Sequence, residues 1–181
     1  FEDQLVTTDL LKVDDAGQII TSNFHRYTAS LYRYENDTVE FTRDIDVEFG
    51  GYTHGLRFLR PNVVAVAVTR GPTGVHVIDL ADRDRRLFHL EIPVKTQDML
   101  VLPDGRLFVI LAHGAPKQAE QNLHHSEFRI YDIDIDRGRS TLVDSSILPK
   151  AHIDACAPHG GSILLTDQLN DKVVILDVRT L

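Results

Sequence analysis

A strand-rich phrase recurs along this chain at a nearly constant distance, and this repeat constrains the fold more than any other feature. Each copy reads as an apolar strand, a tight turn, a second apolar strand, a polar loop, and a third strand that ends on an acidic residue. The turns end at Gly17, Asn62, Gly105 and Gly161, so most copies lie about 45 residues apart. One interval is longer because of an insertion from Gly114 to about Ser126. No window of about twelve residues has a helical period, so the pattern predicts an all-β chain.

A repeat of about 45 residues that carries four strands is typical of a β-propeller blade. We predict a single domain over residues 1–181 with four four-stranded antiparallel blades, at 9–47, 53–92, 96–148 and 152–179. The fourth stretch holds only three strands, and a lone strand at 2–6 precedes the first blade. Two arrangements remain open. Either the strand at 2–6 completes the fourth blade and closes the ring, or the chain is a segment of a larger propeller.

The repeated phrase also resembles a known group of repeats. Residues 102–109 resemble the inner hairpin of NHL, YVTN and gluconolactonase-like propellers, and residues 164–167 and 172–177 resemble the next two strands of that group. The resemblance covers nearly the whole chain but lies in structural positions, such as an Asp-Gly turn that backbone geometry requires. It implies an architecture and no particular chemistry. The chain has no Trp, so the Trp-Asp pair of WD40 repeats is absent.

The lactonase-like members of this group bind a divalent metal through a Glu, several Asn residues and an Asp, and the present sequence departs from that pattern. No Glu begins an inner strand, and His54-Gly55-Leu56 stands where such a family often has Asn-Gly-Leu. Asp167 is the one position that matches. The resemblance therefore gives a lactonase activity only weak support.

Composition narrows the class of partner. The net charge of −8 opposes nucleic-acid binding, and the clustered arginines alternate with aspartates and so form no basic patch. The longest apolar run, Val63–Val68, is far shorter than a membrane-spanning helix. The single Cys156 lies in a strand-like run, which predicts a buried, inert thiol. We therefore expect a soluble protein without a membrane span, and its compartment (periplasmic, secreted or cytoplasmic) stays open.

The blade pattern also decides which loops share a face. In a propeller, the connections between blades and those between the second and third strands emerge on one face, which we call the loop face. The other turns form the turn face. Six of the nine histidines fall on the loop face, which also concentrates other titratable groups. The predicted ligand-binding residues are His25, Arg26, His54, Arg70, Asp98, His113, His152, Asp154 and Asp167.

One recurring position of the repeat on the loop face, at the start of each innermost strand, contains candidate metal ligands. Asp98 and Asp154 each lie seven residues before a turn glycine, where an innermost strand begins. The candidate metal ring is Asp9, His54, Asp98 and Asp154. These residue types suit a divalent cation, which would be the cofactor. Aspartates at strand starts also accept hydrogen bonds from loop N–H groups, so a structural bracing role is the alternative.

Two functions follow from these observations. The first is a non-catalytic binding module that presents its loop face to a protein, peptide or glycan. The second is a metal-dependent, lactonase-like hydrolase that uses the Asp/His ring. The sequence has no nucleophile elbow, phosphate-binding loop or paired-cysteine motif, so whether the chain is an enzyme stays open.

Overall fold

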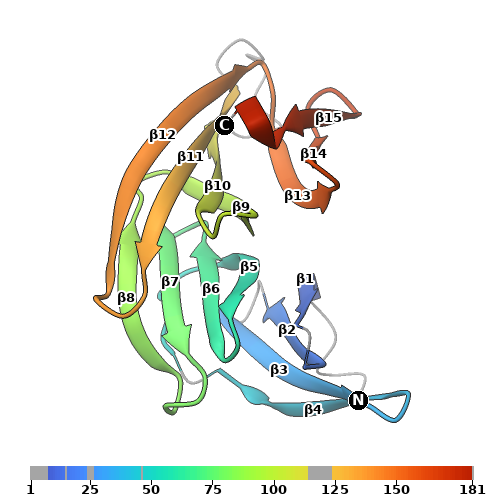
Figure 1. The fold of residues 1–181 in the computed structure, drawn as a ribbon, viewed down its shortest axis with the longest axis vertical. Coiled ribbons are helices and arrows are strands. Elements are labelled where there is room, and N and C mark those ends of the chain that lie inside the picture. Colours follow the sequence, from blue (N-terminus) through green and yellow to red (C-terminus); the bar gives the residue numbers. More distant parts are fainter. Residues whose placement is uncertain (1–7, 15, 24–26, 46, 114–123, 181) are drawn as a thin grey trace. The chain divides into compact units, whose positions relative to one another are not determined.

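The computed structural model describes residues 8–14, 16–23, 27–45, 47–113 and 124–180, which are almost entirely β-structure. Fifteen strands in these ranges form four antiparallel sheets, and one 3-10 helix, Val178–Thr180, follows the last strand. Each sheet is built from strands that are consecutive in sequence (Figure 1). The predicted all-β fold with four blade-like sheets is confirmed. The chain divides into two compact units, Phe1–Pro93 and Val94–Leu181.

The first unit contains two four-stranded sheets, with the orders β1-β2-β3-β4 and β5-β6-β7-β8. The strands of the first sheet are β1 (Thr8–Val13), β2 (Gln18–Asn23), β3 (Thr28–Glu35) and β4 (Thr38–Asp44). Those of the second are β5 (Thr53–Arg60), β6 (Val63–Val68), β7 (Gly74–Asp79) and β8 (Arg85–Glu91).

Packing of these two sheets buries one apolar cluster. Ile20 and Leu31 of the first sheet meet Leu56 and Ile78 of the second sheet there. Every residue of β6 is apolar and buried, as a continuous apolar run predicts for an inner strand. The outermost strand β4 is exposed along nearly its whole length. The outermost strand β8 of the second sheet is likewise more exposed than β6, so burial falls from the inner strands to the outer strand.

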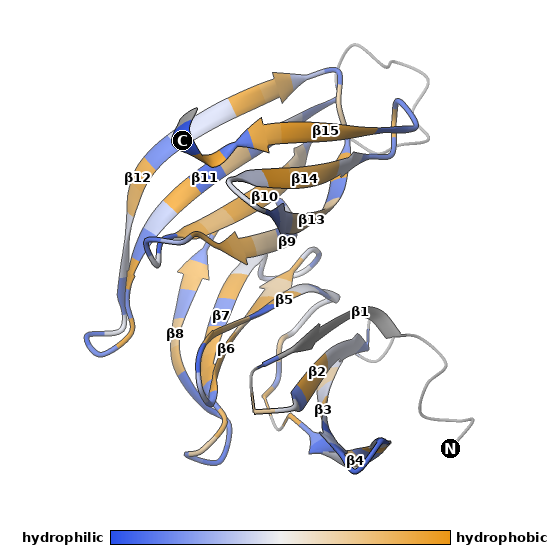
Figure 2. Cartoon of the chain, turned by 45° about the vertical axis from the view of Figure 1, so that its right-hand side comes forward, coloured by the Kyte–Doolittle hydropathy of each residue, from blue (hydrophilic) through white to orange (hydrophobic). Residues whose placement is uncertain are grey.

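The second unit contains a four-stranded sheet, ordered β12-β11-β10-β9, and a three-stranded sheet, β13-β14-β15. Phe108 and Ile110 of the first of these pack with Ile163 and Leu165 of the second. Figure 2 shows β14 and β15 as hydrophobic over most of their length. The strands are β9 (Lys95–Val101), β10 (Leu107–His113), β11 (His125–Asp134), β12 (Arg139–Pro149), β13 (Ile153–His159), β14 (Ser162–Asp167) and β15 (Lys172–Asp177).

Local chemistry at the turns explains why the hairpins form. Gly105 has φ of 88°, which favours glycine, and its N–H donates to the Leu102 carbonyl at 2.9 Å. Asp104 accepts the Arg106 N–H at 3.1 Å. Asn36 and Asp37 between β3 and β4 have φ of 52° and 60°, as a two-residue type I′ hairpin requires.

The structure refines several predicted boundaries. Strands β3, β7 and β15 end at the predicted acidic residues, whereas β11 continues past Asp132 to Asp134. Its partner β12 stays paired with it as far as Pro149, one residue past the predicted end of the third blade. The strand predicted at 2–6 and most of the insertion, residues 114–123, lie outside the described residues. Closure of a ring and a single domain over 1–181 stay predictions.

Candidate binding face

The residues predicted to bind a ligand belong to both units. His54 is the second residue of β5, and Arg70 follows β6 and is exposed. Asp98, His113, His152, Asp154 and Asp167 belong to the second unit. His25 and Arg26 lie outside the described residues, as does the side chain of Asp9 in β1.

Asp98 connects the innermost strands of two neighbouring sheets in the second unit. Its side chain is buried in β9, and Oδ2 accepts the backbone N–H of Cys156 in β13 at 3.0 Å. The Cys156 thiol lies 3.5 Å from the same oxygen. Cys156 is a buried free cysteine, as the sequence predicted. These contacts are the bracing role that the sequence allowed for Asp98.

Asp167 has a similar role at the end of β14. Its Oδ1 accepts the N–H groups of His152 at 3.1 Å and Leu169 at 3.2 Å, and Asn170 Nδ2 donates to Oδ2 at 2.6 Å. Burial alone would raise the pKa of Asp167, but these hydrogen bonds and the charge of Lys172 hold that pKa below its usual range. The ionised side chain of Asp167 therefore connects the segment before β13 to the segment after β14.

His152 is buried beside Asp167, and its Nε2 lies 3.2 Å from the side-chain Nε2 of Gln97. The amide nitrogen of Gln97 is a donor, so His152 Nε2 accepts and the ring is neutral. Burial lowers the pKa of His152, and the nearby charge of Asp154 opposes that shift. The side chain thus serves as a neutral connector between β9 and the start of β13.

His113 takes part in a separate polar group at the loop end of β10 and β11. Its Nε2 lies 3.0 Å from Glu127 Oε2, and Arg129 Nε donates to Glu127 Oε1 at 2.5 Å. The rings of His113 and His125 stack with centroids 4.1 Å apart. Burial would raise the pKa of Glu127, but hydrogen bonds from Arg129 and His113 hold it below the usual range.

The predicted metal ring stays a prediction because its members are divided between the two units. Among the described residues, no group of three or more His, Cys, Asp or Glu side chains has a geometry that could hold a metal ion. Asp154, Asp167 and Asp171 line a shallow hollow of about 450 Å³ beside Lys172. Asp167 already accepts hydrogen bonds from its neighbours there.

Arg70 belongs to a group that the sequence analysis did not predict as a whole. Its guanidinium carbon lies 5.2 Å from the centroid of the Tyr52 ring. The edge of Tyr27 meets the same ring, with centroids 4.7 Å apart and an interplanar angle of 83°. A hydrogen bond with the Tyr52 side chain raises the pKa of Tyr27. We call Tyr27, Tyr52 and Arg70 the aromatic–arginine cluster; all three lie on loop-face connections of the first unit.

Close backbone packing holds the segment around Tyr52 against the segment around Arg70. A Cβ added to Gly51 would lie 1.5 Å from the Arg70 carbonyl oxygen, and one added to Gly71 would lie 2.4 Å from the Gly50 oxygen. The Thr69 N–H donates to the Tyr52 carbonyl at 2.9 Å. Only glycine allows the two segments to approach this closely. These contacts keep the backbone segments of Tyr52 and Arg70 side by side.

The backbone of Tyr27 is also unusual. Its φ of 58° places a bulky aromatic residue in the left-handed region, and 45% of its surface is exposed. The sequence signal for this group was the pair of glycine-containing connections at 50–52 and 70–72. Tyr27 lies about one repeat length before Arg70, in the equivalent connection of the first blade, but the sequence prediction named His25 and Arg26 there and not Tyr27.

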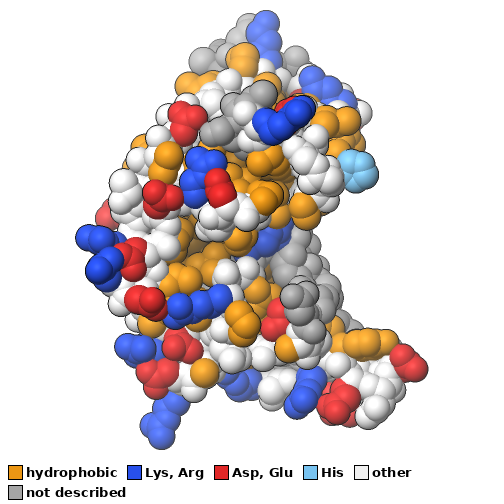
Figure 3. All heavy atoms as spheres, in the orientation of Figure 1, with side chains coloured by type: hydrophobic (Ala, Val, Ile, Leu, Met, Phe, Trp, Pro, Cys, Tyr) orange, Lys and Arg blue, Asp and Glu red, His pale blue; other side chains and the backbone are white. Residues whose placement is uncertain are grey.

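Charged side chains of both signs are interspersed on the face drawn in Figure 3. No helix among the described residues is long and apolar enough to cross a membrane.

Comparisons with known proteins find similar folds at low sequence identity. No known family model matches the chain, and no curated protein matches it. The crystal structure of a functionally unknown protein from Desulfotomaculum acetoxidans DSM 771 aligns with a TM-score of 0.67 at 11% identity, covering 96% of this chain and 56% of that chain. The WD40 β-propeller domain of Doa1 aligns with a TM-score of 0.63 at 15% identity, covering 94% of this chain and 50% of that chain.

The chain spans about half the length of these two structures, and at such identities the likeness concerns the fold alone. The described structure is therefore propeller-like. The narrower resemblance to NHL, YVTN and gluconolactonase-like repeats has no further support. The neighbour with WD40 repeats shares the architecture although this chain contains no Trp.

Proposed function

We propose that this chain is a non-catalytic binding module that engages a protein or peptide through the loop face of its first unit. The observation that carries the proposal is the aromatic–arginine cluster of Tyr27, Tyr52 and Arg70. Tyrosine and arginine are among the residues most enriched at the energetic centres of protein interfaces. They supply large contact area, hydrogen-bonding groups and a charge while losing little conformational freedom when already held in place.

The backbone of Tyr27 supports the same proposal. A non-glycine residue in the left-handed region costs about 1–2 kcal/mol. Strain of this kind collects at binding and catalytic sites, where the surrounding structure maintains it. Glycine would adopt this turn conformation at a lower cost, so the exposed Tyr27 ring is compatible with a role in binding.

The contacts in the second unit favour binding over the metal-dependent hydrolase. Asp98 and Asp167 both accept backbone N–H groups, which is the chemistry of bracing. The two structural neighbours, one of unknown function and one a WD40 β-propeller domain, are compatible with an interaction module.

The test begins with peptides selected from a random display library against the intact chain. Binding of the selected peptides is then measured by calorimetry for the wild type and for Tyr27→Gly, Arg70→Gln and Arg85→Gln. The control residue Arg85 is an exposed arginine of the same unit that pairs with Asp82 at 2.6 Å. Tyr27→Gly and Arg70→Gln should each weaken binding by about tenfold or more, and Arg85→Gln should leave it unchanged.

Tyr27→Gly separates binding from folding, because glycine relieves the left-handed strain while it removes the ring. Selected peptides that bind all four proteins equally would contradict the proposal. A glycan array in parallel distinguishes a carbohydrate partner: binding there that depends on Tyr27, with no peptide selected, would replace the proposed partner class.

A further inference from the structure

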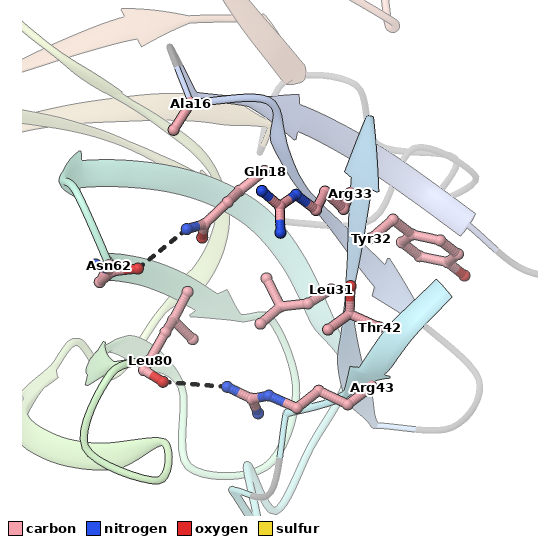
Figure 4. Close-up of a pocket in the computed structure, with 9 residues that line it drawn as sticks. All are labelled: Ala16, Gln18, Leu31, Tyr32, Arg33, Thr42, Arg43, Asn62 and Leu80. Carbon is pink, nitrogen blue, oxygen red and sulfur yellow. Dashed lines mark hydrogen bonds between the residues drawn. The ribbon is translucent and has the colours of Figure 1, made fainter. Parts of the chain in front are cut away.

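A hollow of about 320 Å³ opens on the turn face of the first unit, between its two sheets. The lining comes from β2, β3 and β4 on one side and from the β5–β6 and β7–β8 turns on the other (Figure 4). Its volume is at the lower end of the range for small-molecule pockets, so it fits a group about the size of one amino-acid residue.

Two polar bridges across the sheets hold this hollow open. Gln18 Nε2 donates to Asn62 Oδ1 at 3.0 Å on one side. On the other side Arg43 Nη2 donates to the Leu80 carbonyl at 3.1 Å (Figure 4). Arg43 also pairs with the buried carboxylate of Asp84. The bridges join strands of the first sheet to turns of the second sheet, so they hold the two walls of the hollow together without a ligand.

The two bridges leave hydrogen-bonding groups for a ligand. The Gln18–Asn62 bond uses one amide hydrogen of Gln18 and one lone pair of Asn62. Gln18 Oε1 is a further acceptor, and the Asn62 amide nitrogen is a further donor, so the pair can receive both sides of a peptide group. The floor is apolar, since Leu31 and Leu80 line the hollow and are themselves 6% and 7% exposed.

Arg33 supplies the charge of the hollow. It lies two residues after Leu31 on β3, so both side chains are on the same face of the strand (Figure 4). Its Nε pairs with Glu35 at 3.2 Å, but the two side chains are 67% and 60% exposed. A pair this exposed contributes little, so the terminal guanidinium N–H groups can bind an incoming carboxylate through two parallel hydrogen bonds.

We propose that this hollow binds the α-carboxylate of an acylated aliphatic amino acid, the chemistry of a peptide C-terminus. Arg33 binds the carboxylate, Gln18 and Asn62 bind the adjoining amide, and the aliphatic side chain packs on Leu31 and Leu80. Capture of a terminal carboxylate by positively charged and amide groups is a recurrent mode of peptide recognition. The site is separate from the loop face and does not depend on the function proposed above.

The experiment is a titration of the intact ¹⁵N-labelled chain with acetyl-leucine, acetyl-glycyl-leucine and the carboxamide of each. The two acids should shift the amide signals around Leu31, Asn62 and Leu80. The carboxamides should bind with an affinity at least about tenfold lower. Equal binding of acid and carboxamide, or no shift with any compound at about 10 mM, would overturn the carboxylate assignment.

Variants locate the binding and identify its source. Arg33→Gln should weaken acid binding by about tenfold, whereas Arg85→Gln and Tyr27→Gly should leave it unchanged. Unchanged binding by Arg33→Gln would contradict the proposal. Tighter binding of acetyl-glycyl-leucine than of acetyl-leucine identifies a peptide terminus, and equal binding identifies a free small acid. Inorganic phosphate that displaces the acids at similar concentration would show that the hollow selects only for negative charge, contrary to the proposal.

Discussion

His76 on β7 should make the first unit sensitive to mild acid. Its side chain is 1% exposed, and both ring nitrogens lack a hydrogen-bond partner among the described residues. The ring stacks on His89 of β8, its cross-strand partner, with centroids 4.2 Å apart, and Phe49 meets it edge-on. Burial, together with the charges of His89 and Arg86, lowers the pKa of His76 to about 3. The folded unit therefore holds a neutral imidazole at neutral pH.

Acid lowers the stability of the first unit because the unfolded chain binds protons more readily than the folded one. The folded pKa lies below the unfolded value of about 6.5, so the unfolded chain binds more protons between these two limits. Stability is complete above about pH 6.5 and falls as the pH decreases, by about 1.4 kcal/mol per unit. Between about pH 7.5 and pH 5.0, His76 alone should cost about 2 kcal/mol. Burial and Arg86 also lower the pKa of His89, while Glu91 opposes that shift, so His89 adds to the loss in the same direction.

The assay compares urea unfolding, followed by circular dichroism, at about pH 7.5 and pH 5.0 for the wild type, His76→Leu and His159→Gln. Hydrogen exchange of the β7 and β8 amides locates the change within the first unit. His76→Leu should reduce the pH-dependent loss by about 2 kcal/mol, because the replacement cannot titrate and fills similar volume. The exposed His159 is the control and should behave like the wild type. An equal loss in the wild type and in His76→Leu would refute the reasoning.

Three further predictions test the loop face. Asp98→Ala should lower the free energy of unfolding by about 1–3 kcal/mol because the buried Cys156 N–H loses its acceptor, and an unchanged urea midpoint would refute the bracing role. Gly51→Ala should cost about 2–4 kcal/mol, since its Cβ would lie 1.5 Å from the Arg70 oxygen; a loss below about 1 kcal/mol would show that the connection relaxes easily. Tyr27→Gly should raise the thermal stability by about 1 kcal/mol as it relieves the left-handed backbone, and a lower melting temperature would show that the ring supports the fold.

The sequence by itself determined the repeat and therefore the four antiparallel sheets. Turn residues such as Gly105 and the apolar run of β6 act locally, through backbone conformation and burial, so they can be recognised without tertiary structure. The sequence also singled out Asp98, because Asp98 and Asp154 occupy the same position of the repeat, where an innermost strand begins. The sequence also predicted correctly that residues 152–179 contain three strands, while the pairing of residues 2–6 with them stays a prediction.

Only the tertiary structure decided what these residues contact. A carboxylate at the start of a strand can bind a metal ion or a backbone N–H, and the choice for Asp98 depended on Cys156, which lies 58 residues away in sequence. The blade repeat places the three connections of the aromatic–arginine cluster on one face, but only the structure shows that their side chains pack together and that Gly51 and Gly71 bring two of the connections into close backbone contact. His76 and His89 became a buried stacked pair through the register of β7 and β8. Local propensity fixes where strands begin and end, whereas the charge state and partners of a polar side chain depend on the strands that pack against it.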